Sequence, residues 1–269
     1  MAWDPRQYHK FQGERMAPFA DVVALGSWRP GLNIVDLGCG TGELTARLAD
    51  LSEGADILGI DSSASMLAES ARHMRPGLRF AKQAIETFVP EVPLDVLFSH
   101  AALQWLDDHP ALFRRLAGHL LIGGQLLVQM PSNHDHVSHL IVRELAATPP
   151  WPDRLGGFVR HSPVLSIDSY AELLYALGFD RPIVLEKVYG HVLADADAVL
   201  EWVRGTLLVP YLERLGEAHR DEFLDAIRAH YQAAMPTRPY YYAFRRTLIA
   251  ATVLTLIGNV AFVAADSDG

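Results

Sequence analysis

The stretch Asp36-Leu37-Gly38-Cys39-Gly40-Thr41-Gly42 decides the fold of this chain of 269 residues. Its first two residues are the end of an apolar run, Leu32–Leu37, which is typical of a buried strand. A helical pattern over Glu43–Leu51 follows the stretch directly. Three glycines at alternate positions permit a tight turn between strand and helix, and they let a ligand approach the backbone beside the helix N-terminus. The stretch therefore predicts a ligand-binding strand-loop-helix unit.

Short apolar runs alternate with helical patterns from Leu32 onward, which predicts βαβ units and a mostly parallel sheet. The first five strands are predicted at Leu32–Leu37, Asp56–Ile60, Leu78–Ala81, Leu94–Ser99 and Gln125–Met130. The helices among and after them are predicted at Glu43–Leu51, Ala64–Met74, Pro110–Leu120 and His136–Ala147. Residues 148–165 are rich in Pro, Gly and Trp without periodicity, which predicts a loop or an irregular lid.

The second half of the chain predicts further helices and strands. Helices are expected at Ile167–Leu177, Ala196–Thr206 and Glu217–Ala234, and strands at Ile183–Tyr189 and Phe244–Leu254. Tyr240-Tyr241-Tyr242 is either an aromatic wall or the packed start of the last strand, and we favour the strand.

Composition excludes several classes of partner. The 23 basic and 32 acidic residues give a net charge of −9, so no summed positive field attracts a nucleic acid. A single cysteine, Cys39, cannot form an internal disulfide, and the N-terminus lacks a secretory pattern, so we expect a cytoplasmic protein.

The uncharged run Thr247–Ala265 is nearly long enough to span a membrane. Its threonines and β-branched residues favour two short strands around a Gly258-Asn259 turn instead of an anchor.

An acidic residue, Asp61, ends the second predicted strand, where it can grip the hydroxyls of a ribose. A plain strand-to-helix turn in which Asp61 caps the next helix is one alternative. A nicotinamide dinucleotide is another, because dinucleotide folds also combine a glycine loop with an acid on the second strand. Their glycine spacing is G-x-G-x-x-G, however, whereas this loop is G-x-G-x-G.

The combined pattern resembles the S-adenosylmethionine (SAM) signature of class I methyltransferases. The resemblance implies that Asp36 lies near the methionine part of SAM and that Asp61 takes both ribose hydroxyls. It also implies that the remaining cofactor contacts come from Gly38, Gly40, Gly42, Ser62, Met66, Ile85, Ser99 and Arg15.

Several segments resemble the trans-aconitate methyltransferase family, and together they cover about residues 2–252. The most specific are Trp3-Asp4-Pro5 with Tyr8, Phe11 and Glu14-Arg15, and Val128-Gln129-Met130-Pro131 with Asn133 and His139. Others are Leu103-Gln104-Trp105 with Asp108-His109, then Trp202, Gly205-Thr206, Pro210-Tyr211 and Phe244-Arg245-Arg246. The resemblance implies methylation of a carboxylate oxygen of a small polycarboxylic acid, without a metal ion and without a catalytic proton shuttle.

Substrate contacts are expected from side chains that the resemblance and the predicted sheet edge bring together, namely Tyr8, Gln104, Trp105, His134, Trp202, Tyr211, Arg245 and Arg246. Arg245 and Arg246 are equally compatible with a charged turn outside the last strand. Arg15 and Tyr8 either close an N-terminal helix over SAM or lie on a surface helix. His134 and His136 are anion contacts or solvated loop residues, and they lack a third ligand for a metal.

The chain departs from the family pattern at a few positions. Ala17 and Val209 stand where many relatives have an arginine, and Ala84-Ile85 replaces an Asp-Leu step that contacts adenine in relatives. Glu86 or the backbone then supplies the adenine contact. These departures leave open whether a tricarboxylate or another small acid is the preferred substrate.

We therefore expect an α/β, Rossmann-like class I methyltransferase with a mostly parallel seven-stranded sheet, helices on both faces and a helical cap. Residues 1–254 form one domain, with cap elements from 1–28 and about 148–240, followed by an extension at 255–269. The substrate is trans-aconitate or a similar acid. A methyltransferase for another small molecule, or a SAM-binding protein without transferase activity, is the alternative.

Overall fold

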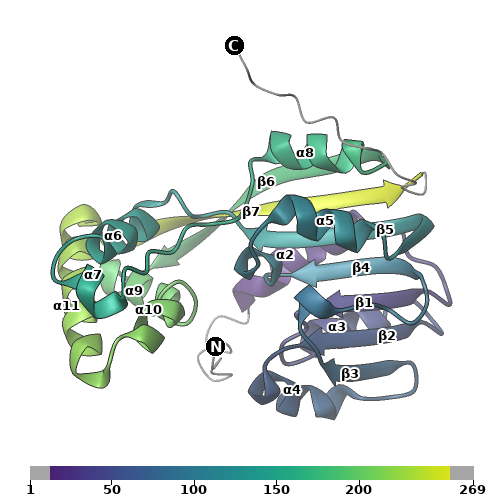
Figure 1. The fold of residues 1–269 in the computed structure, drawn as a ribbon, viewed down its shortest axis with the longest axis horizontal. Coiled ribbons are helices and arrows are strands. Elements are labelled where there is room, and N and C mark those ends of the chain that lie inside the picture. Colours follow the sequence, from purple (N-terminus) through teal and green to yellow (C-terminus); the bar gives the residue numbers. More distant parts are fainter. Residues whose placement is uncertain (1–12, 255–269) are drawn as a thin grey trace.

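The computed structural model describes residues 13–254, whose strands form one seven-stranded sheet of order β3-β2-β1-β4-β5-β7-β6 (Figure 1). The strands are β1 (Asn33–Leu37), β2 (Asp56–Asp61), β3 (Leu78–Lys82), β4 (Leu94–His100), β5 (Leu120–Pro131), β6 (Phe179–Leu193) and β7 (Tyr240–Val253). β1 to β5 are parallel, and β7 runs antiparallel to both β5 and β6. The predicted mostly parallel seven-stranded sheet is confirmed.

Helices on both faces cover this sheet. Those beside it are α2 (Gly13–Ala24), α3 (Glu43–Ala49), α4 (Ala64–Ser70), α5 (His109–Ala117) and α8 (Ile167–Ala176), with 3-10 turns η1 (Ala71–His73), η2 (Ile85–Thr87) and η3 (Leu103–Trp105). Side chains alternate along a strand, so Val35 and Leu37 of β1 join the core under α5 and α8, whereas Ile34 joins the core under α2 and α3.

Five helices form a separate layer around a third hydrophobic core. They are α6 (Val137–Ala146), α7 (Trp151–Leu155), α9 (Ala196–Arg204), α10 (Val209–Arg214) and α11 (Glu217–Ala234). Figure 1 shows this layer beside the sheet, where β6 ends and β7 begins. Tyr242 and Phe244 of β7 belong to the same core, so the strand connects the sheet to the helical layer.

Several details of the sequence prediction are wrong, and the strand predicted to begin at Gln125 begins at Leu120. The helix predicted at Pro110–Leu120 ends at Ala117, because Leu120 already pairs with Leu94 as the start of β5. Residues 148–165 contain the short helix α7, and α10 was missed. β6 and β7 are longer than predicted because they pair with each other along their whole length. The pairing runs from Phe179 opposite Val253 to Leu193 opposite Tyr240, beyond the apolar runs that indicated the strands. The favoured prediction that Tyr240 to Tyr242 begin the last strand is confirmed.

The uncharged run from Thr247 begins inside β7, which is paired on both sides. Its continuation, including the predicted turn at Gly258-Asn259, lies outside the described residues. Within residues 13–254, no helix combines the length and the apolar character needed to cross a bilayer.

The strand order reverses at β1, which has β2 on one side and β4 on the other. In open parallel sheets, the loops at the carboxyl ends of such strands diverge and leave a crevice for a ligand. The loops after β1, β2 and β4 therefore frame the candidate site.

Candidate active site

The glycine loop after β1 has the conformation that its sequence predicts. Gly38, Gly40 and Gly42 have φ of +78°, +56° and +76°, a region that favours glycine. A Cβ on Gly38 would lie 2.3 Å from the Cβ of Ala102, and one on Gly40 would lie 3.2 Å from the Cε of Met66. The loop thus approaches the neighbouring loops more closely than a chain with side chains at these positions could.

Asp61, at the end of β2, holds the glycine loop and the start of α4 together. Its Oδ2 accepts a hydrogen bond from the backbone nitrogen of Gly40 at 2.9 Å, and its Oδ1 accepts one from Ser63 at 2.8 Å. Burial raises the pKa of Asp61, and these two hydrogen bonds oppose the shift. Each oxygen retains a free lone pair, so the carboxylate can still accept hydrogen bonds from two ligand hydroxyls.

A cavity of about 250 Å³ lies over this loop. Predicted cofactor residues that line it are Gly38, Gly40, Asp61, Ser62, Met66 and Ile85. Glu86, His100, Ala102 and Leu106 complete much of the remaining wall. The cavity therefore combines a carboxylate at one part of its wall with apolar side chains at another.

Three predicted cofactor residues whose side chains are described do not line this cavity. Gly42 lies at the start of α3 as its N-cap. Ser99 is fully buried, and its hydroxyl donates to the carbonyl of Leu37 at 2.9 Å. Asp36 lies buried behind the loop, and the side chain of Arg15 lies outside what the structure describes.

Asp36 is a buried carboxyl group that is neutral over much of the pH range. Burial raises its pKa to about 7, the hydroxyl of Thr45 opposes the shift, and repulsion by Asp61 adds to it. The Thr45 hydroxyl donates to Asp36 Oδ2 at 2.6 Å. The folded protein therefore retains a proton here that an unfolded chain would release.

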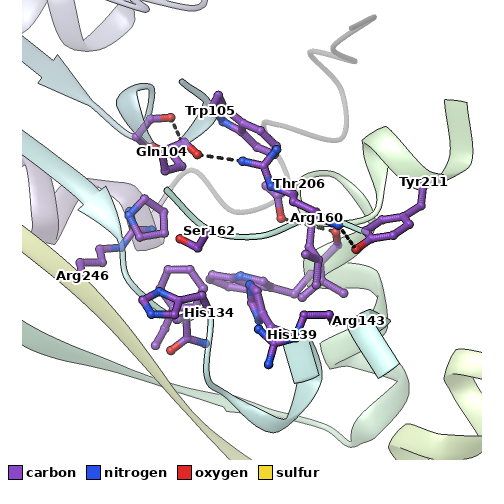
Figure 2. A pocket seen from close by; sticks show the side chains of 17 residues that line it. Gln104, Trp105, His134, His139, Arg143, Arg160, Ser162, Thr206, Tyr211 and Arg246 are labelled. Carbon is purple, nitrogen blue, oxygen red and sulfur yellow. Dashed lines mark hydrogen bonds between the residues drawn. The ribbon is translucent and has the colours of Figure 1, made fainter. Parts of the chain in front are cut away.

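A second cavity, of about 170 Å³, adjoins the first, and Ala101 and Trp105 line both. Ala101 follows β4 with a φ of +57°, and its backbone nitrogen donates to the carbonyl of Gln129 at 2.8 Å. Figure 2 shows the second cavity between η3, the loop before α6 and the segment that carries Arg160. A ligand in one cavity is thus separated from a ligand in the other by little more than Ala101 and the Trp105 ring.

The second cavity is rich in cationic side chains. Arg143, Arg160 and Arg246 line it, whereas no aspartate or glutamate of residues 13–254 does so. Within the same residues, no carboxylate forms an ion pair with Arg143 or Arg160. Arginine stays protonated at all physiological pH values, and a charge withdrawn from water is costly unless it is paired. Arg246 is buried, and Arg143 and Arg160 are half-buried. The cavity therefore favours an anionic ligand.

Arg160 connects three parts of the cavity wall. Its guanidinium lies 4.3 Å from the centre of the Trp105 ring and donates to the carbonyl of Gln104 at 2.8 Å. Its backbone nitrogen donates to the Tyr211 hydroxyl at 2.9 Å. These contacts fix the guanidinium plane while its remaining N–H groups stay available to a carboxylate.

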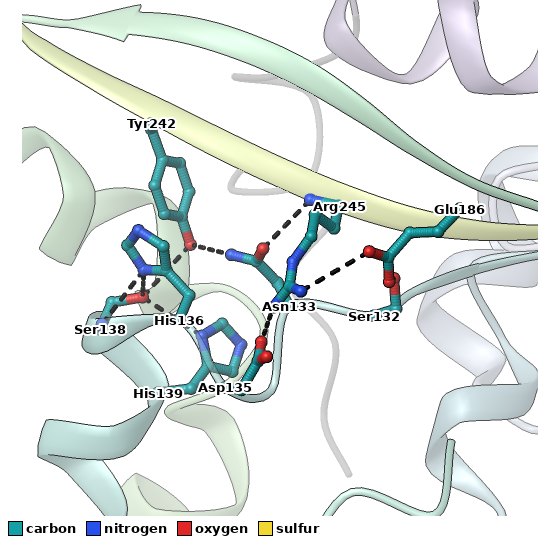
Figure 3. Close-up of polar contacts among 9 residues, drawn as sticks. All are labelled: Ser132, Asn133, Asp135, His136, Ser138, His139, Glu186, Tyr242 and Arg245. Atoms are coloured by element: carbon teal, nitrogen blue, oxygen red, sulfur yellow. Dashed lines mark hydrogen bonds and ion pairs between the residues drawn. The ribbon is translucent and has the colours of Figure 1, made fainter. Parts of the chain in front are cut away.

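The histidines of this wall are neutral. Burial and the neighbouring His136, His134 and Arg160 lower the pKa of His139 to about 3. Burial also lowers the pKa values of His134 and His136. The hydroxyl of Ser138 lies 2.9 Å from Nδ1 of His136 and 3.2 Å from Nδ1 of His139 (Figure 3). The arginines alone therefore supply the positive charge of the cavity near neutral pH.

The structure separates the two adjacent arginines of β7. Arg246 is buried in the cavity wall, where its Nη1 donates to Gln129 Oε1 at 3.2 Å. Arg245 points to the other face of the strand and pairs with Asp135 and, at 3.5 Å, with Glu186 (Figure 3). Because side chains alternate along a strand, only one of two neighbours can face the cavity.

All but one of the other predicted substrate residues line the second cavity. Gln104, Trp105, His134, Trp202 and Tyr211 line the second cavity, and Tyr8 lies outside the described residues. The sequence prediction missed Arg143 and Arg160. Arg143 follows His139 by four positions on α6, a spacing that places both on one helix face, whereas Arg160 lies in an aperiodic loop that gave no signal.

Comparisons with known proteins agree with this geometry. A model of a methyltransferase domain matches residues 34–124. The trans-aconitate 2-methyltransferase of Deinococcus radiodurans is 48% identical over 258 residues, which cover 94% of this chain and 98% of that protein. The same enzyme from Azoarcus sp. strain BH72 is 40% identical, covering 88% and 92%.

A solved structure shows the same fold. The SAM-dependent methyltransferase from Thiobacillus denitrificans in complex with S-adenosylhomocysteine matches with a TM-score of 0.53 and 18% identity, covering 88% of this chain and 91% of that one. The chain thus has the Rossmann-like fold of class I methyltransferases. Together with the relatives, the matched domain shows a SAM-dependent methyltransferase. Within that class, the chain belongs to the trans-aconitate 2-methyltransferase family.

Replacing Asp36 with Asn is expected to stabilise the protein, increasingly so as the pH rises. An amide still accepts the Thr45 hydrogen bond and stays neutral, as protonated Asp36 does. The folded-state pKa of about 7 exceeds the ordinary value of 3.8, so the wild type loses stability as the pH rises between them. The advantage of D36N in unfolding free energy should grow by on the order of 2 kcal/mol from pH 5 to pH 8 in urea denaturation.

The matched control for this experiment is Asp56→Asn, at an exposed carboxylate. Its effect on stability should hardly change between the two pH values. A constant advantage of D36N over the same range would show that Asp36 is ionised throughout.

Proposed function

We propose that this protein transfers the methyl group of SAM to a carboxylate oxygen of a small polycarboxylic acid and releases its monomethyl ester. The observation that carries the proposal is the cavity lined by three arginines and no carboxylate of the described residues, next to the glycine-loop cavity. Trans-aconitate, the acid named for the relatives, is the first candidate.

The glycine-loop cavity suits SAM. Asp61 has lone pairs left for the ribose hydroxyls, and a side chain on Gly38 would collide with Ala102. Met66, Ile85 and Leu106 offer apolar surface for adenine. When bound there, SAM supplies an electrophilic methyl group on a positively charged sulfur.

The reaction requires little acid-base catalysis from the protein. A carboxylate is already ionised at neutral pH, so no general base is needed. Arg143, Arg160 and Arg246 bind the carboxylates and orient the acid, and Trp105 and Ala101 border the passage between the cavities. Holding the attacking oxygen in line and excluding water supply the acceleration.

We further propose that the helical layer serves as a cap over the acid. Trp202, Thr206 and Tyr211 from α9, α10 and the turn between them line the acid cavity, as does Arg143 of α6. The same helices share their own hydrophobic core. The N-terminal contribution expected from residues 1–28 remains part of this proposal.

The test is S-adenosylhomocysteine release from the purified protein with SAM and a panel of acids. The panel contains trans-aconitate, cis-aconitate, citrate, isocitrate and malonyl thioesters. Turnover with trans-aconitate supports the proposal, despite Ala17 and Val209 at positions where relatives have arginine. Turnover with only one other acid identifies that acid as the substrate. Tight SAM binding without turnover on any acid of the panel would contradict the proposed substrate class, and the acceptor would have to be sought elsewhere.

Asp61→Ala should weaken SAM binding without unfolding the protein. Hydrogen bonds to a charged group contribute about 1.5–3 kcal/mol, so the Kd for SAM should rise by roughly tenfold to a hundredfold in calorimetry. Ser63→Ala is the matched control, because it removes only the N-cap hydroxyl of α4. An unchanged Kd in D61A would contradict the assignment of the ribose contact.

Arg160→Ala should raise the KM for the acid about thirtyfold to several thousandfold while the Kd for SAM stays within about threefold. Truncating one partner of a buried charge pair typically costs about 2–5 kcal/mol. The matched control is Arg204→Ala on α9, where the side chain is 50% exposed and pairs with Glu201. Equal KM values in R160A and R204A would contradict an arginine-bound carboxylate.

A further inference from the structure

His109 and Tyr170 form a buried pair that lines neither cavity. His109 begins α5 and is 1% exposed, and Tyr170 of α8 is fully buried. Nδ1 of His109 contacts the Tyr170 hydroxyl, and Nε2 lies 3.1 Å from the carbonyl oxygen of Leu103. The Tyr170 hydroxyl also accepts a hydrogen bond from the backbone nitrogen of Leu165 at 3.3 Å.

These contacts determine where the protons lie. A carbonyl oxygen only accepts, so Nε2 of His109 must carry the proton that is donated to Leu103. In the neutral ring Nδ1 is then an acceptor, and the Tyr170 hydroxyl donates to it. Burial lowers the pKa of His109, so the neutral ring is the form present near neutral pH.

The pair connects two walls of the acid cavity from behind. Leu103 is the first residue of η3, whose other two residues, Gln104 and Trp105, line the cavity. Leu165 ends the segment that contributes Arg160 and Ser162 to the opposite wall. Within the cavity the same two walls meet where Arg160 stacks on Trp105 and donates to the Gln104 carbonyl.

The local backbone shows that His109 is held in place. Asp108, directly before it, adopts a φ of +49°, a strained conformation for a residue with a side chain, and caps α5 through Ala111. The rings of His109 and Tyr170 both pack against Phe113, with centroids 5.7 and 5.2 Å away. A polar pair in such a core is costly unless every donor and acceptor is used, as it is here.

We propose that Tyr170 and His109 are positioning residues, which set η3 against the Arg160 segment so that the bound acid lies in line with the methyl group. The proposal rests on the proposed carboxylate methylation only for its kinetic test. Neither residue touches SAM or the acid. Their effect reaches the reaction through Trp105 and Gln104.

Tyr170→Phe and His109→Leu should lower kcat by about tenfold to a hundredfold, because a small displacement of the cavity wall misaligns the reacting atoms. The Kd for S-adenosylhomocysteine should change less than threefold, since Asp61 and the glycine loop are untouched. His109→Gln offers a donor and an acceptor in the same places and should restore kcat to within about threefold of wild type. Unchanged kcat in Y170F and H109L, or no recovery in H109Q, would overturn the proposal.

Ser52→Ala is the control for a simple loss of stability. It removes another buried hydrogen bond, from Ser52 to the carbonyl of Arg29 at 2.5 Å, at a position that lines neither cavity. With a Tm lowered to a similar degree, S52A should keep the wild-type kcat. A parallel fall of kcat in S52A would show that stability alone explains the other variants.

Nitrogen NMR tests the geometry without any acid. The ¹⁵N signals of His109 are assigned in histidine-labelled protein as those that disappear in H109Q. Their chemical shifts should be those of a neutral ring with a proton on Nε2 and none on Nδ1. The opposite tautomer would overturn the proposal. A wild type that methylates no acid would refute the proposed function and leave this spectroscopic result standing.

Discussion

Gly38 and Ala102 lie so close that a Cβ on the glycine would be 2.3 Å from that of the alanine. This contact joins the loop after β1 to the loop after β4, two strands that are neighbours where the sheet order reverses. Because the loops touch, the glycine-loop cavity and the arginine-lined cavity meet at Ala101 and Trp105. A larger residue at position 38 would separate the loops and with them the two ligands.

The two cavities are electrostatically opposite. Asp61 and Glu86 line the glycine-loop cavity, where a sulfonium cofactor carries positive charge. The arginines lie on the other side, where an acid brings negative charge. Methyl transfer cancels one positive and one negative charge, so a dry junction between the cavities favours the reaction. Neutral histidines suit this scheme, because they donate or accept hydrogen bonds without adding charge.

The sequence predicted more of the wall of the glycine-loop cavity than of the arginine-lined cavity. The loop from Gly38 to Gly42 and the acid at Asp61 are local signals, since the turn that they require is made within a few residues. The acid cavity is assembled from α6, η3, β7 and the Arg160 segment, which meet only in the tertiary structure. Arg160 lies in an aperiodic loop, so neither spacing nor hydropathy indicated its direction.

The strands, too, were predicted well where the signal is local and poorly where it depends on tertiary pairing. β1, β2 and β4 are largely buried and apolar, β3 is a short edge strand, and their apolar runs predicted all four to within a residue or two. The long antiparallel pair β6 and β7 extends to Leu193 and Tyr240, where exposed and polar side chains break the apolar pattern. Pairing with a distant partner stabilises these extensions. Of the adjacent Arg245 and Arg246, the alternation of a strand allows one in the cavity, but the choice depends on which face the helical layer covers.

Carboxylate methylation is tested most sharply with SAM that carries a ¹³C-labelled methyl group and with trans-aconitate, the product being followed by NMR. We expect one labelled methyl ester per S-adenosylhomocysteine formed, and mild alkali should convert this ester to labelled methanol. Label on nitrogen or carbon of any acceptor, or labelled SAM that stays bound and unreacted with every acid of the panel, would contradict it.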